Sequence, residues 1–180
     1  MEDGELSLIE SPFAERELIR DQDDMMKNHK IGAGLYALWG VVHVLGGITI
    51  LIQWLQGGGS AVLEAMGGSG TVPVVVPDVM DGVAGYHFFN IMWIGLVVSV
   101  VAATMNWKNS RVGAWINLAL VGFADAGLVM FMLVPGYISW GEGMIGIGLF
   151  IPAAVLTVIG TRNASVPTTA SELKLRPADA

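Results

Sequence analysis

Residues 31–55 read IGAGLYALWGVVHVLGGITILIQWL, a stretch that contains no Asp, Glu, Lys or Arg. At a rise of about 1.5 Å per residue, an α-helix of this length crosses the ~30 Å hydrocarbon layer of a bilayer. Backbone N–H and C=O groups in lipid must be hydrogen-bonded within the protein, because no water is available to them. This stretch therefore predicts a membrane-spanning helix.

Three further stretches have the same apolar character, at residues 83–107, 112–138 and 141–161, and the only charged side chains in them are Asp125 and Glu142. Over the whole chain, 53% of the residues are hydrophobic and 14% are charged, which is more apolar than a water-soluble core requires. The sequence predicts an all-α membrane protein: a four-transmembrane-helix bundle over residues 31–161, with a long outer loop at residues 56–82.

The basic residues set the expected orientation of this bundle. All nine Lys and Arg lie before the first span, between the second and third, or after the fourth: Arg16, Arg20, Lys27, Lys30, Lys108, Arg111, Arg162, Lys174 and Arg176. Short cytoplasmic segments carry an excess of Lys and Arg. We therefore expect a multi-pass protein of the cell membrane with both termini in the cytoplasm (N-in/C-in).

The two flanking segments differ from the spans in composition. Residues 1–30 are acidic and account for most of the net charge of −7. Ser11 followed by Pro12 is typical of a helix start, so we expect this cytoplasmic segment to be partly helical. Residues 162–180 lack apolar periodicity and predict a disordered cytoplasmic tail.

The net negative charge of the chain gives no electrostatic reason to bind nucleic acid. The expected partners are the lipid bilayer and either other membrane subunits or further copies of the chain.

Polar side chains inside a membrane span are costly and are therefore the first candidates for function. The helical rise places His43 and Asp125 at about the same depth, just outside the midplane. Other polar side chains of the spans lie near the outer boundary, so we expect one ligand-binding cluster in the outer half of the bundle: His43, His87, Asn90, Asp125, Tyr137 and Glu142. The inner half offers mainly Asn106 and Asn117.

Small and aromatic residues surround His43 on the first span. Gly40 and Gly47 lie three residues before and four residues after it, and so share its helix face. Small residues in such positions allow either a close approach by another helix or space for a ligand, and we favour packing. Trp39 and Trp93 fall within spans rather than at their ends, and we expect them to pack between helices.

No motif in the sequence identifies a reaction, and whether the protein is an enzyme stays open. The favoured interpretation is a structural or accessory subunit of a membrane assembly, in which a contact between His43 and Asp125 sets the helix register. A second is a membrane enzyme or proton-coupled transporter that handles a lipid-like small molecule with these two residues as acid and base. A third is a haem b or metal protein with His43 and His87 as ligands.

Cysteine labelling tests the predicted orientation, because the chain contains no Cys and a single engineered thiol gives the whole signal. We expect a membrane-impermeant maleimide to label Ser69→Cys, in the outer loop, in intact cells. Ser165→Cys, in the C-terminal tail, should react only after the cells are opened. The reverse pattern would contradict the N-in/C-in orientation.

Overall fold

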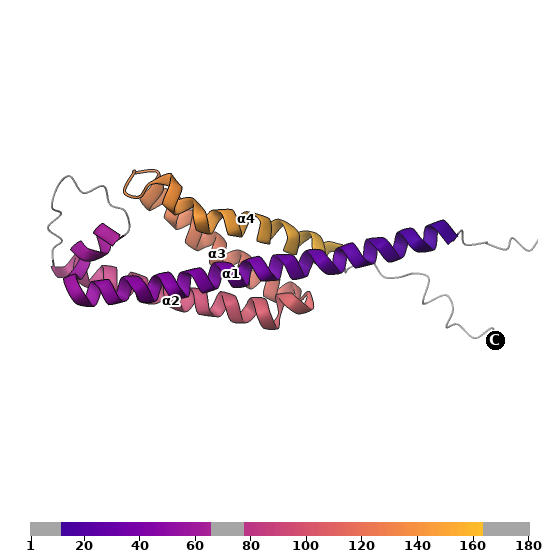
Figure 1. The fold of residues 1–180 in the computed structure, drawn as a ribbon, viewed down its shortest axis with the longest axis horizontal. Helices are drawn as coiled ribbons and strands as arrows, with labels where there is room; N and C mark the ends of the chain where they lie inside the picture. The colour runs from indigo at the N-terminus through magenta and orange to yellow at the C-terminus, as the bar shows by residue number, and fades with distance from the viewer. Residues whose placement is uncertain (1–11, 66–77, 164–180) are drawn as a thin grey trace, which may run out of the picture.

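The structure, a computed structural model, describes residues 12–65 and 78–163 (Figure 1). Its elements are α1 (Pro12–Ala65), α2 (Asp78–Thr104), the 3₁₀-helix η1 (Asn106–Lys108), α3 (Arg111–Leu128), the π-helix η2 (Val129–Leu133) and α4 (Trp140–Asn163). Four segments are long and apolar enough to cross a membrane: Lys27–Val62, Val79–Lys108, Arg111–Leu133 and Gly143–Thr161. The prediction of four apolar spanning helices is confirmed. The sequence predicts that the tail starts at residue 162, but α4 continues to Asn163. The rest of the predicted tail, residues 164–180, lies outside the described residues.

Helix α1 is the common packing partner of the bundle. It runs alongside α2 on one side and α4 on the other, and α3 packs against both α2 and α4 (Figure 1). The N-terminal part of α1 projects beyond the ends of the other helices. We call the end of the bundle that carries Lys30, Lys108 and Arg111 the basic end.

The connection between the first two spans has more helix than the sequence predicts. Instead of a loop over residues 56–82, α1 continues to Ala65 and α2 begins at Asp78. The helical path of α1 is broken by a kink at Gly57 and Gly58, whose dihedral angles are not helical. Gly58 has a φ of +66°, a conformation that residues with a Cβ rarely adopt. The kink lets the chain turn and still form further helix.

Asp81 of α2 holds the kink in place. Its carboxylate accepts a hydrogen bond from the backbone N–H of Gly59, the first residue after the kink. Its backbone carbonyl accepts a hydrogen bond of 2.8 Å from the indole N–H of Trp54, the residue type that the boundary of a span favours. One residue thus connects both sides of the kink to the start of α2.

Glycine residues bring α1 and α2 close together. A Cβ added at Gly95 of α2 would lie 2.7 Å from the carbonyl oxygen of Gly40, and one added at Gly47 would lie 2.9 Å from the Cβ of Met92. Neither position has room for a side chain. Packing, the favoured interpretation of Gly40 and Gly47, is confirmed.

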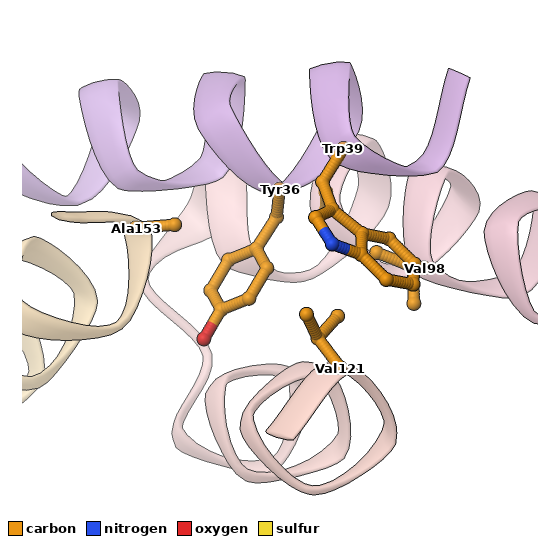
Figure 2. Packing of buried hydrophobic residues seen from close by; sticks show 6 residues of the cluster. Tyr36, Trp39, Val98, Val121 and Ala153 are labelled. Atoms are coloured by element: carbon orange, nitrogen blue, oxygen red, sulfur yellow. The ribbon is translucent and has the colours of Figure 1, made fainter. Parts of the chain in front are cut away.

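The core of the bundle forms where side chains of α1 enter the space between the other helices. Figure 2 shows the ring of Tyr36 extending between α3 and α4, and the indole of Trp39 lying over α2 and α3. The buried residues of this core are Tyr36, Trp39, Val98, Ala102, Val121 and Ala153. The expected burial of Trp39 is confirmed. The same expectation for Trp93 is wrong, because its side chain is 49% exposed on the outer face of α2 and its ring contacts Phe89.

The turn between α2 and α3 closes the basic end. Asn109 adopts the left-handed conformation, with a φ of 56°, and its side-chain amide donates a hydrogen bond of 3.1 Å to the carbonyl of Gly160 in α4. Ser110 then caps α3 by accepting a hydrogen bond from the N–H of Gly113. The turn is thus fixed to the helix on the far side of the bundle.

Replacing Gly40 with Ala should lower the stability of the folded protein. The added methyl group would overlap the carbonyl oxygen of Gly95, and overpacking of this kind costs about 1–3 kcal/mol. Gly34→Ala is the matched control on the same helix, because an added Cβ there meets no atom within 4 Å. Thermal unfolding in detergent measures both. Equal melting temperatures for the two variants would contradict the close approach of α1 and α2.

Candidate functional site

Three polar side chains meet over the backbone of α4 at Gly146. A Cβ added at Gly146 would lie 3.2 Å from Nε1 of Trp39, 3.4 Å from Cε1 of His43 and 3.5 Å from Oδ1 of Asp125. Trp39 and His43 come from α1 and Asp125 from α3, so three helices build the site. We call Trp39, His43 and Asp125 the polar centre. The absence of a side chain at Gly146 leaves the space into which they converge.

The spacing of Trp39 and His43 on α1 places them on one face, because residues four apart lie one helical turn from each other. Their rings stack with centroids 3.6 Å apart and planes at 19°. On the side of α2, a Cβ added at Gly95 would lie 3.0 Å from the Cβ of His43, so the α2 backbone supports the imidazole side chain. The ring is held in position from two directions.

A hydrogen bond defines which nitrogen of His43 carries the proton. Nδ1 lies 2.7 Å from the carbonyl oxygen of Trp39. A carbonyl oxygen only accepts, so Nδ1 must be the donor, and Nε2 of the neutral ring is left as a proton acceptor. His43 is half-buried, and its Cε1, which is bonded to both ring nitrogens, lies next to Gly146. The imidazole therefore has the tautomer that a base requires.

Asp125 is buried, with 5% of its surface exposed, and it lies within a membrane-spanning segment. Its Oδ2 is without a hydrogen-bond partner among the described residues. Leaving a buried polar atom unpaired costs about 1–3 kcal/mol, and most buried polar atoms in proteins are paired. The polar centre thus keeps unused hydrogen-bonding capacity inside the membrane.

One turn after Asp125, the chain changes from the α-helix α3 to the π-helix η2. Val129 donates from its backbone N–H to the carbonyls of both Asp125 and Ala126, and the π-helix η2 starts at this residue. The sequence predicts an uninterrupted span over residues 112–138, whereas the regular α-helix ends at Leu128. Single π-helical turns occur frequently at functional sites, because they reorient the side chains beside them.

Of the five predicted cluster residues whose side chains the structure describes, His43 and Asp125 are brought together at Gly146. His87 is exposed on α2, where its ring packs edge-on against Phe88 with centroids 5.2 Å apart. Asn90 is half-buried, and Tyr137 is 68% exposed. The side chain of Glu142 lies outside the described part of the structure.

Sequence reasoning missed Trp39 as a polar participant, because an indole inside a span was expected only to pack. The signal that could have found it is its spacing of four residues from His43.

The two histidines proposed as haem ligands lie in different surroundings. Nδ1 of His43 is engaged by the Trp39 carbonyl, and His87 is exposed. Among the described residues, no group of three or more His, Cys, Asp and Glu side chains gathers as a metal site would require. Haem b or metal binding by His43 and His87 remains a prediction.

Comparison of the chain with known proteins assigns it to no group. No protein family, curated protein or solved structure matches it.

Asp125→Asn should leave the melting temperature unchanged or raise it. The amide removes a buried ionisable group at constant shape, and uncompensated buried charges destabilise proteins. Asn117→Leu is the control on the same helix, because the buried Asn117 donates a hydrogen bond of 3.3 Å to the carbonyl of Val98. Its loss should cost about 0.5–1.5 kcal/mol. If Asp125→Asn destabilised the protein as much as Asn117→Leu, the carboxylate would be a structural contact.

Proposed function

We propose that the protein is a multi-pass membrane protein whose polar centre binds and releases protons, in the service of transport or chemical change of a membrane-soluble small molecule. The observation that carries this proposal is the buried carboxylate of Asp125, which has an unpaired oxygen and faces the same point as His43 within the spans. Ionisable groups in this position are typical of proton pathways.

The unpaired carboxylate oxygen of Asp125 favours this proposal over a purely structural role. Among the described residues, Asn106, Asn109 and Asn117 also have unpaired buried atoms, but none of these side chains is ionisable. A polar contact that only sets helix register is expected to satisfy its own donors and acceptors. Here Asp125 Oδ2 is unsatisfied among the described residues. Such an atom is available to a proton, a water molecule or a substrate group. This supports a working site over a static contact.

The residues of the polar centre suggest how a proton would move. Protonated Asp125 is neutral, which suits its burial. Transfer of its proton to Nε2 of His43 would produce a carboxylate and an imidazolium, and the N–H of Trp39 lies next to the position of the new negative charge. Return of the proton restores two neutral side chains. The pair can therefore act as acid and base in turn.

Infrared spectroscopy tests this exchange without knowledge of the substrate. In acidic buffer, protonated Asp125 should give a carboxyl C=O band that is lost in Asp125→Asn. On transfer to deuterated buffer, the band should shift at once in the native protein, because His43 relays the exchange. The shift should be at least about tenfold slower in His43→Phe, which removes a general acid–base group.

The control for this experiment is Asp81→Asn, which keeps an acceptor oxygen for the N–H of Gly59 and removes a carboxylate outside the polar centre. It should retain both the Asp125 band and its fast shift. An Asp125 band that exchanges equally fast in the native protein and in His43→Phe would contradict the relay. So would a band that exchanges too slowly to follow in both proteins.

A role as an accessory subunit of a membrane assembly is the second candidate. The observation that favours it is the N-terminal part of α1, which projects beyond the other helices that the structure describes (Figure 1). Deletion of residues 1–26 should then abolish co-purification of a membrane partner while the bundle remains folded. Recovery of the same partner in equal amount with the shortened chain would exclude this role for the projection.

A further inference from the structure

A cavity of about 350 Å³ lies between α1, α3 and α4 near the basic end of the bundle. Its lining combines Tyr36 of α1, Thr157 of α4 and Arg111 at the start of α3 with apolar side chains that include Leu118 and Val158. Cavities of this volume are within the usual range for small-molecule sites. None of the residues of the polar centre lines it, so it is a separate site.

Two buried hydroxyl groups in this lining have no partner. Tyr36 and Thr157 are both more than nine-tenths buried, and neither Tyr36 Oη nor Thr157 Oγ1 has a hydrogen-bond partner in the described part of the chain. Figure 2 shows the hydroxyl of Tyr36 directed away from α1, between α3 and α4. Buried hydroxyls are normally hydrogen-bonded. Both hydroxyls thus belong to side chains of the cavity lining and lack an acceptor among the described residues.

Towards its mouth, the cavity is lined by a positively charged side chain and an aromatic side chain that are both exposed. Arg111 and Trp115 line it and are both exposed, Trp115 by 70%. Arginine pairs with phosphate through two parallel hydrogen bonds, and tryptophan favours the headgroup level of a bilayer. Lys30 and Lys108 add positive charge at the same end of the bundle. The mouth therefore suits an anionic headgroup.

We propose that this cavity binds an acidic phospholipid, with its phosphate at Arg111 and an ester carbonyl accepting hydrogen bonds from the hydroxyls of Tyr36 and Thr157. The first part of one acyl chain lies along the apolar lining beside Leu118 and Val158. Basic pockets between transmembrane helices are known to bind anionic headgroups. An ester carbonyl supplies an acceptor without a buried charge, which matches two neutral donors.

Native mass spectrometry of the full chain in neutral detergent tests this site with phosphatidylglycerol and phosphatidylcholine of identical acyl chains. The native protein should retain phosphatidylglycerol more strongly. Arg111→Gln should weaken phosphatidylglycerol binding about tenfold, the usual effect of losing a hydrogen bond between charged groups. Lys108→Gln is the matched control, because it makes the same charge change at the same end outside the cavity lining. It should weaken phosphatidylglycerol binding much less than Arg111→Gln, because it removes a nearby positive charge but no contact with the phosphate.

The hydroxyl groups are tested by Tyr36→Phe and Thr157→Val, which conserve shape. Each should weaken the binding of either phospholipid roughly threefold, because both lipids carry the ester carbonyl. Unchanged helix content and elution volume establish that these variants are folded. Asp125→Asn should leave lipid binding unchanged, so failure of this inference and failure of the proton-exchange proposal can be told apart.

Equal retention of the two phospholipids would overturn the proposal, as would an equal loss in Arg111→Gln and Lys108→Gln. A third arm uses oleate, which has the charge and the chain but no phosphate. Strong binding of oleate together with weak binding of phosphatidylglycerol would assign the cavity to a fatty acid and overturn the phospholipid assignment.

Discussion

The close approach of the α1 and α2 backbones at Gly40 and Gly95 is the contact on which the other features depend. In lipid, helices gain little from burying apolar side chains against each other, so association relies on close van der Waals packing and on polar contacts. Two facing glycines provide that packing. They also fix the rotation of α1, because only one face of the helix can lie this close to α2. Its neighbouring face, with Tyr36 and Trp39, is then directed into the bundle.

With α1 in this position, the polar groups of the bundle separate into two sites. The polar centre contains the ionisable side chains His43 and Asp125 and lies against Gly146 of α4. The cavity near the basic end contains the hydroxyls of Tyr36 and Thr157, with Arg111 at its mouth. The two sites share α1, α3 and α4 but have different chemistry. One suits proton exchange, and the other suits an amphiphile with an anionic headgroup.

Among the described residues, unpaired buried atoms are not confined to these two sites, because Asn106, Asn109 and Asn117 also carry them. The two sites differ from these Asn side chains in that the unpaired atom belongs either to an ionisable carboxylate or to the lining of a cavity. Asn117 is fully buried on α3, yet its amide nitrogen donates to the Val98 carbonyl and so serves packing. Asn109 likewise donates to Gly160 and fixes a turn. By comparison, among the described residues the unpaired Oδ2 of Asp125 belongs to an ionisable group, and the unpaired hydroxyls of Tyr36 and Thr157 belong to the lining of a cavity. A bundle that retains such atoms retains places where a ligand or a proton gains the missing interaction.

The sequence by itself determined the four apolar spans and the identity of the two ionisable residues deepest within them, because hydropathy and charge are properties of short segments. It also indicated that Gly40 and Gly47 serve packing. Only the tertiary structure decided which polar atoms meet, since that depends on the rotation of each helix about its own axis. That rotation turned Trp39 towards Asp125, left His87 exposed and placed Tyr36 and Thr157 around one cavity. The α-helical period alone cannot set it, because lipid surrounds the bundle and apolar residues occupy every face of each span.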